Sequence, residues 1–337
     1  FRRVLFRSDF GIEEWDWPQG VGLYGLSMLQ DYYRDDRFME FFLNWFRSNI
    51  ERGLPSRNIN TTCPYLTLLQ ILDRIPEPEH SRYETMCIEQ AEWLMHGLPK
   101  TTDGGFQHVT TGIGDRNGVI LNEQQLWLDT LFMAVLFLQQ MGIRCDRKDW
   151  RDEATHQVLL HIKYLYCKNN GLFYHGFSFI RNDNFGGIFW CRGNSWFTLG
   201  LTLFLEKADY LDGGTRQFII DTFRTHAEAL RSYQAEDGLF HTVIDDATSY
   251  EEASGTAAMA AGLLRGMKAG ILDESYRVCA DRAITALCDC VDTDGTVLKV
   301  SAGTAMGMNA EHYKGIGIRP MAYGQALTLI ALCEALQ

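Results

Sequence analysis

Hydrophobic residues recur along most of this chain at the spacing of helices, and strand-like alternation is confined to short stretches. The pattern predicts eleven helices. Three consecutive pairs are the clearest, at 124–142 with 148–168, 192–209 with 213–235, and 254–271 with 273–291. The remaining helices are expected at 20–35, 36–53, 62–74, 79–98 and 321–336.

Short turns interrupt the helical pattern at regular intervals. Each is an Asp-Gly or Asn-Gly pair, and the four glycines are Gly104, Gly171, Gly238 and Gly295. Successive turns lie 67, 67 and 57 residues apart, and each one opens a short stretch with β character. Such a period indicates a helical hairpin that is used several times along the chain.

The two helices of each pair differ in composition. The first is rich in Gly, Ala and aliphatic residues, as in LGLTLFL (199–205) and GTAAMAAGLLRGM (255–267), and the second is more charged and amphipathic. Inner and outer layers of a closed ring have this character. We therefore predict an all-α fold, an (α/α)6 barrel. The rival is an open α-solenoid, but the interruptions at 99–122, 170–191 and 296–320 are longer than a solenoid needs and are typical of functional loops.

The first eight residues, FRRVLFRS, do not fit the pattern. They lack the apolar core of a signal peptide, and they equal the translation of a common sequencing-adapter string. We expect residues 1–8 to be non-native and part of the first helix, the twelfth of the ring, to be missing. Residues 9–337 are then expected to form one catalytic domain.

Composition excludes several classes of partner. The formal net charge is −12 and no polybasic run occurs, which argues against nucleic acid and anionic membranes. No uncharged apolar stretch reaches the length of about 18 residues that spans a bilayer. The nine cysteines include no CxxC pair, which favours free thiols in a reducing compartment, the bacterial cytoplasm. No metal-ligand spacing or nucleotide-binding motif occurs, so we expect no metal and no cofactor. A monomer or weak homodimer is expected.

Asp129 is an acid in an unexpected place. It lies near the start of QLWLDTLFMAVLFLQQMG (125–142), which is apolar nearly all round. A buried carboxylate must be hydrogen-bonded, neutralised or functional. Its apolar neighbours, Trp127 and Phe132 among them, are expected to raise its pKa toward that of a general acid. The alternative is a structural Asp that braces a neighbouring loop.

The segments before the predicted inner helices should meet at one mouth of the ring. They are rich in Trp, Asn, His and Arg, a composition that suits a carbohydrate better than a nucleotide. The segments are WDWPQG (15–20), RNINTTCP (57–64), Asp103 with His108, Asp129, His175 with FWCRGNSW (189–196), SYEEASGT (249–256) and GMNAEHYKGIGIRP (307–320).

Several of these motifs together resemble one enzyme family. WPQGVGLYGL, GGFQH, QLWLDTLFMAVLFL, LFYHGF, FWCRGNSW, SYEEASGTAAMA and RPMAYGQALTLIAL occur in the order found in the unsaturated rhamnogalacturonyl hydrolases of glycoside hydrolase family 105. These are relatives of the unsaturated glucuronyl hydrolases of family 88. The resemblance covers nearly the whole chain from about Trp15, and it implies an (α/α)6 barrel. It also implies hydration of the C4=C5 double bond of an unsaturated uronic acid at a non-reducing end.

The resemblance assigns roles to individual residues. Asp129 matches the acid that protonates C4 and then activates water. His175 matches a substrate-contacting His, and Trp190 and Arg192 match the WxRG element. Arg192 is expected to hold the uronate carboxylate, or alternatively to pair with Glu251 or Glu252. Trp17 resembles an aromatic that stacks on the substrate, although it would fit equally well as a core residue.

One departure from the family concerns a second active-site Asp. At that junction this chain has Asn58 and Asn60, and no acid. Asp103 is a candidate replacement, but its position after an outer helix favours a turn residue. His108, Trp196 and Arg319 complete the expected substrate-binding set. Arg319 could instead brace the last helix, and a solvated loop residue is the alternative for His108.

Other functions stay open on the sequence. The first is a family 88-like glucuronyl hydrolase acting on glycosaminoglycan-type fragments. The second is a sugar epimerase, which would need two facing His bases that the sequence does not indicate. The third is a sugar-binding toroid with an inactive site.

Overall fold

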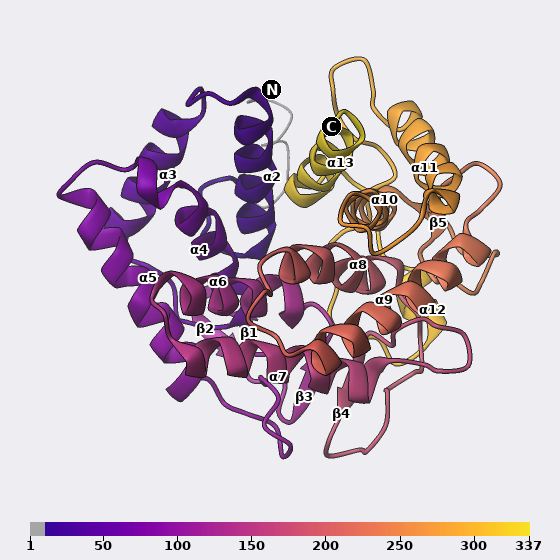
Figure 1. Cartoon of the computed structure of the whole chain (residues 1–337), viewed down its shortest axis with the longest axis horizontal. Coiled ribbons are helices and arrows are strands. Elements are labelled where there is room, and N and C mark those ends of the chain that lie inside the picture. Colours follow the sequence, from indigo (N-terminus) through magenta and orange to yellow (C-terminus); the bar gives the residue numbers. More distant parts are fainter. Residues whose placement is uncertain (1–10) are drawn as a thin grey trace.

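Helices form two concentric layers in the computed structural model, which describes residues 11–337 (Figure 1). The predicted non-native segment 1–8 lies outside the described residues. The inner layer consists of α2 (Trp17–Tyr33), α4 (Ile59–Ile71), α6 (Leu136–Arg144), α8 (Cys191–Glu206), α10 (Ala253–Lys268) and α13 (Ala322–Ala335). The outer layer consists of α3 (Met39–Glu51), α5 (Glu79–His96), α7 (Lys148–Leu165), α9 (Gly213–Tyr233) and α11 (Arg277–Asp289).

The inner helices close into a ring. Each packs against the next along the chain, and α13 packs against α2. Small residues permit this close approach. A Cβ atom on Gly262 of α10 would lie 2.6 Å from the carbonyl oxygen of Thr198 on α8, and one on Gly25 would lie 2.7 Å from Cβ of Ala326. The Gly- and Ala-rich composition of the first helix in each pair follows from this packing, and the predicted all-α (α/α)6 fold is confirmed.

Capping groups fix where several helices begin. Asn58 caps α4, because its side chain accepts a hydrogen bond from the N–H of Thr61, whose hydroxyl in turn accepts from the N–H of Asn58. Asp212 caps α9 through the N–H groups of Gly214 and Thr215. Asn58 therefore fixes the start of inner helix α4 at the mouth, and Asp212 fixes the start of outer helix α9.

The predicted turns are confirmed at all four glycines. Gly104, Gly171, Gly238 and Gly295 have φ values of 85°, 76°, 99° and 84°, a left-handed conformation that favours glycine. The β stretches that follow them are short. They include β4 (Gly176–Ser178) and β5 (Phe240–His241), the latter paired with β6 (Glu251–Glu252).

One predicted helix differs from the structure. The expected helix 124–142 begins later, because 125–127 form strand β3, which pairs antiparallel with β4. A π-helical turn, Leu131–Val135, then leads into α6. Short apolar runs fit a buried strand as well as a helix, so their period could not separate the two.

The long loops carry three small elements. A hairpin of β1 (Thr110–Gly112) and β2 (Asp115–Ile120) precedes β3. The short helix α12 (Ala310–Lys314) lies in the loop before α13, and the hydrophobic pattern did not predict it. Among the described residues, no helix is both long and apolar enough to cross a membrane.

Candidate functional site

Asp129 lies at the junction between strand β3 and an inner helix. The N–H of Leu128 donates to the carbonyl of His175 over 2.9 Å, which extends the β3–β4 pairing to the residue before Asp129. The carbonyl of Asp129 accepts from the N–H groups of Phe132 and Met133 in the π-helical turn. Asp129 therefore sits at the N-terminus of the helix, where the helix dipole favours a negative charge. Such π-helical turns often occur at functional sites.

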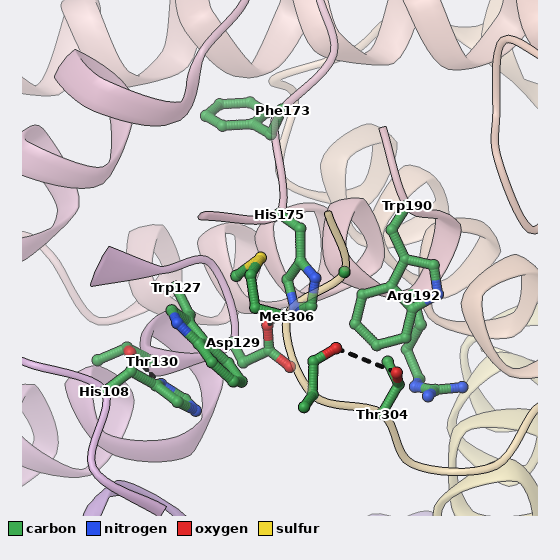
Figure 2. A network of polar contacts seen from close by, with 12 residues as sticks. His108, Trp127, Asp129, Thr130, Phe173, His175, Trp190, Arg192, Thr304 and Met306 are labelled. Atoms are coloured by element: carbon green, nitrogen blue, oxygen red, sulfur yellow. Dashed lines mark hydrogen bonds and ion pairs between the residues drawn. The ribbon is translucent and has the colours of Figure 1, made fainter. Parts of the chain in front are cut away.

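His175 faces the carboxylate of Asp129. Its Nε2 lies 3.2 Å from Oδ2 of Asp129, and the two side chains are 2% and 17% exposed. The pair is close enough for an ion pair but falls short of hydrogen-bond geometry, and neither atom has another hydrogen-bond partner among the described residues. In Figure 2 the carboxyl group points toward the loop that carries Thr304 and Met306. The small exposure leaves Asp129 reachable from the mouth.

The pKa of Asp129 differs in direction from the expectation. Burial is the largest single influence and raises it, as predicted from the apolar neighbours, but His175, His108 and a backbone hydrogen bond together outweigh burial, so the pKa lies below its ordinary value. The predicted raised pKa is therefore wrong for the free protein. The sequence could not place His175 beside Asp129, because the two are 46 positions apart.

His108 supports the site from behind Trp127. Its ring stacks on the indole at 4.4 Å, and its Nδ1 lies 2.8 Å from the hydroxyl of Thr130. Burial lowers the pKa of His108 to about 3, so the ring is neutral at neutral pH. Trp127 lies against His175 as well, at 5.5 Å between ring centroids. The two histidines thus both contact the indole of Trp127 and do not face each other as a pair of bases.

A buried tyrosine contacts the other side of His175. The hydroxyl of Tyr313 on α12 lies 2.7 Å from Nδ1 of His175 and accepts from the N–H of Gly307 at 3.0 Å. Trp190 packs on the imidazole with ring centroids 4.5 Å apart. Trp190 is only 2% exposed, so it positions His175 and has little surface to offer a substrate.

Arg192 is tied to the protein. It is fully buried at the start of α8, and its guanidinium donates to the carbonyl groups of Ser301 and Ala302 at 3.0 and 2.8 Å. Glu252, also buried, lies 3.7 Å away. The structure thus shows the pairing with Glu252 that the sequence left open. The predicted contact with a uronate carboxylate would require this network to open.

A cavity of about 620 Å³ lies at the mouth, and Thr304, from the loop toward which the Asp129 carboxyl group points in Figure 2, forms part of its wall. Its lining includes two predicted substrate-binding residues, Trp17 and Asn60. Trp17 is partly exposed and stacks on Tyr323 with ring centroids 4.6 Å apart. The aromatic face and the amide suit the apolar face and the hydroxyl groups of a sugar ring.

The same cavity holds charged residues that the sequence analysis did not single out. Asp16 caps α2 by accepting from the N–H of Trp17, and burial raises the pKa of its carboxyl group. Arg116 lies on the β1–β2 hairpin, and Nε and one terminal nitrogen of its guanidinium are buried without a hydrogen-bond partner among the described residues. Glu14 lies 3.4 Å from Arg116. Asp16 therefore places a carboxyl group at the start of α2, whereas the start of the next inner helix, α4, carries the amide of Asn60.

A second cavity, of about 580 Å³, lies at the opposite end of the ring. It is lined by the C-terminal parts of inner helices, and Arg265 there forms ion pairs with Glu206 and Glu334. None of the predicted site residues lines it. The mouth beside Asp129 is therefore the candidate site.

Three predicted substrate-binding residues lie elsewhere than expected. Trp196 is 0% exposed and packs in the core against Phe132 and Trp17. Asp103 pairs with Lys163 at 2.8 Å on outer helix α7, as a turn residue would. Arg319 is exposed, and its N–H donates to the carbonyl of Val300. Trp196 thus offers no surface to a ligand, and the carboxylate of Asp103 is already paired with Lys163.

The sequence missed the residues that complete the site from the loop before α13. Thr304 and Met306 come from a stretch without a periodic pattern, and Tyr313 was part of a loop motif without an assigned role. The one signal in the sequence for such a role was Tyr313 itself, a polar aromatic residue in a Gly-rich loop. Among residues 11–337, no group of three or more His, Cys, Asp or Glu side chains gathers as metal ligands.

Comparison with known proteins agrees with the resemblance seen in the sequence. The profile of Glycosyl Hydrolase Family 88 matches residues 7–337. The chain is 32% identical to the unsaturated rhamnogalacturonyl hydrolase YesR of Bacillus subtilis over 334 residues, which cover 98% of this chain and 92% of that protein. It is 31% identical over 182 residues to an unsaturated 3S-rhamnoglycuronyl hydrolase of Formosa agariphila, covering 51% of this chain and 48% of that protein.

Solved structures show the same fold. A possible member of the GH105 family from Salmonella enterica is 35% identical with a TM-score of 0.90, over 97% of this chain and 84% of that chain. The unsaturated glucuronyl hydrolase of Bacillus sp. GL1 has a TM-score of 0.71 at 21% identity, over 98% of this chain and 89% of that chain. At that identity the second likeness concerns the fold alone.

Proposed function

This chain belongs to Glycosyl Hydrolase Family 88, and on that premise we propose that it removes a 4,5-unsaturated uronic acid of the galacturonate type from lyase-generated oligosaccharides. The observation that carries the proposal is the placement of Asp129. Its carboxylate lies beside His175, at a helix N-terminus and at the mouth of the ring. A cavity with an exposed aromatic face lies at the same mouth. YesR, whose name specifies an unsaturated rhamnogalacturonyl hydrolase, is similar over nearly its whole length.

The proposed reaction needs one acid/base residue. Asp129 donates a proton to C4, and the positive charge that develops is shared between C5 and the ring oxygen. The Asp129 carboxylate then takes a proton from a water molecule while that water bonds to C5. The C5 hemiketal opens to a ketone, and the hemiacetal left at C1 collapses to an aldehyde and releases the neighbouring sugar. One water molecule is consumed. A single acid/base residue serves both steps, whereas most glycosidases use two carboxylates.

The lowered pKa of Asp129 in the free protein fits this scheme if substrate binding raises it. The substrate carries its own carboxylate, and a bound sugar excludes water from the mouth. Both effects disfavour a charged Asp129 and raise its pKa. The carboxyl group would then take up its proton in the complex, where that proton is used.

The cavity at the mouth has a lining that suits the sugar that is released. Trp17, Asn60 and Thr304 lie on its wall. We assign Trp17 the stacking contact and Asn60 a hydrogen bond to a hydroxyl group. Asp16 and Arg116 would then limit which sugars fit.

The direct test uses the ultraviolet absorbance of the unsaturated uronate, which hydration of C4=C5 abolishes. Purified protein is incubated with unsaturated rhamnogalacturonan disaccharide and, separately, with unsaturated chondroitin disaccharide. We expect absorbance to fall with the first. A preference for the second would instead support the glucuronyl hydrolase alternative, and no change with either would support a sugar-binding toroid.

We also propose a bacterial cytoplasmic location and a monomer or weak homodimer. The nine cysteines support the location, because all are present as free thiols and most are buried.

A further inference from the structure

We propose that Tyr313 is a positioning residue that fixes the tautomer of His175 and so directs the acidic proton of Asp129 to its outer oxygen, Oδ1. This inference rests on the proposed function for its catalytic meaning. Its structural part, the tautomer of His175, does not depend on any activity.

Tyr313 has one hydroxyl proton and a defined set of neighbours. The hydroxyl oxygen accepts from the N–H of Gly307 at 3.0 Å. Its own proton has two acceptors within reach, Nδ1 of His175 at 2.7 Å and the thioether sulfur of Met306 at 3.7 Å. A thioether is a weak acceptor and the imidazole nitrogen is a strong one. The Tyr313 proton therefore points to His175.

The position of this hydroxyl is held firmly. Tyr313 is 0% exposed and its ring packs beside Trp190, at 5.8 Å between centroids. Gly307 passes so close that an added Cβ would lie 2.6 Å from a ring carbon of Tyr313. The carbonyl of Tyr313 accepts from the hydroxyl of Tyr250 at 3.3 Å. The contact with His175 thus depends on the packed loop and not on a mobile side chain.

The tautomer of His175 follows from this contact. A neutral imidazole carries one proton, and an Nδ1 that accepts from Tyr313 leaves that proton on Nε2. Nε2–H then faces Oδ2 of Asp129 at 3.2 Å. Oδ2 is buried, so the N–H occupies the side of the carboxyl group that is turned away from the mouth.

The consequence concerns the protonated form of Asp129. With the proton-bearing Nε2 only 3.2 Å from Oδ2, a proton on that oxygen would lie close to a second polar hydrogen, so the acidic proton sits on Oδ1. Without Tyr313, His175 can place its proton on Nδ1 and turn a lone pair toward Oδ2. The imidazole would then hold the acidic proton on the buried oxygen, away from the C4 atom that must receive it.

The test is Tyr313→Phe, which removes the hydroxyl and keeps the ring. The first readout is the 15N NMR signals of His175, which distinguish a proton on Nδ1 from one on Nε2. The second is kcat and KM on the unsaturated disaccharide. We expect the wild type to carry the proton on Nε2 and the variant to shift toward Nδ1. We expect kcat to fall about 10- to 100-fold, which is less than the roughly 10²–10⁴-fold contribution of a general acid because Asp129 itself remains, while KM changes little.

Tyr250→Phe is the matched control. It removes a hydroxyl that bonds to Tyr313 but does not touch His175, and we expect the tautomer and kcat of the wild type. An Nδ1–H tautomer in the wild type would overturn the proposal, and so would an unchanged tautomer in Tyr313→Phe. If both variants lose kcat equally, loop packing explains the loss and the proposal is wrong. A wild type that is inert on every substrate but carries Nε2–H would contradict the proposed function and leave the tautomer assignment supported.

Discussion

The N–H of Leu128 donates to the carbonyl of His175, and this one backbone bond brings the two polar groups of the candidate site together. It continues the antiparallel register in which Trp127 faces Gly176. The distance between Asp129 and His175 is therefore set by strand pairing between two long loops. The inner helix supplies the N-terminus on which Asp129 sits, and the loops supply its partner.

Replacing His175 should change the ionisation of Asp129. In the wild type burial raises the pKa of Asp129, and His175, with smaller contributions from His108 and a backbone hydrogen bond, holds it below its ordinary value. In His175→Gln burial remains and the opposing effect is lost, so we expect the pKa to rise above the ordinary value. 13C NMR of the Asp129 carboxyl group measures it. His108→Gln should produce a smaller rise, and an unchanged pKa in His175→Gln would show that the pair is not coupled.

Arg192→Met should lower the free energy of unfolding and have a smaller effect on KM. The buried guanidinium holds Ser301 and Ala302, and its removal leaves Glu252 without its cation. Breaking a buried pair costs about 3–5 kcal/mol. Urea unfolding should show this loss, and Glu252→Gln added to Arg192→Met should recover part of it. A variant of unchanged stability but strongly raised KM would instead support the predicted contact with the uronate carboxylate.

Trp17→Ala should weaken substrate binding without affecting the chemical step. The ring lies partly exposed on the cavity wall and is held by stacking on Tyr323. Aromatic contacts contribute about 0.5–1.5 kcal/mol, so KM should rise roughly 2- to 10-fold. Steady-state kinetics on disaccharides gives the comparison. Equal losses in kcat and kcat/KM would place Trp17 at the reacting centre and contradict its assignment to the released sugar.

Acid should destabilise the fold through buried neutral histidines. Burial lowers the pKa of His226 to about 4 and that of His108 to about 3. The unfolded chain protonates these groups near their ordinary value, so it binds more protons than the native state as the pH falls from about 6.5 to about 4. Each group then removes about 1.4 kcal/mol of stability per pH unit in that window.

Chemical denaturation between pH 7 and pH 4.5 tests this sign. His226→Gln should show a shallower loss of unfolding free energy with falling pH than the wild type. His156→Gln, at an exposed position on α7, is the matched control and should keep the wild-type slope. Equal slopes in all three proteins would contradict a buried, neutral His226.

The ring was predictable from the sequence because it depends on local patterns. Helical periodicity, Gly-rich inner helices and the Asp-Gly turns all act over a few residues, and each was confirmed. The site was predictable only in part. Asp129 was marked by its apolar surroundings, whereas its low pKa depends on His175, which a loop brings in from 46 positions away. Arg192 and Trp196 look like ligand-binding residues in the sequence because the demands of a buried network and of a sugar site select the same residue types.

The most direct test of the account compares the wild type with Asp129→Asn in loss of the ultraviolet absorbance of an unsaturated rhamnogalacturonan disaccharide. Asp149→Asn, on outer helix α7, serves as the control. The account predicts rapid loss with the wild type and the control, and a rate about 10²–10⁴-fold lower with Asp129→Asn. An Asp129→Asn protein that retains most of the wild-type rate would contradict it.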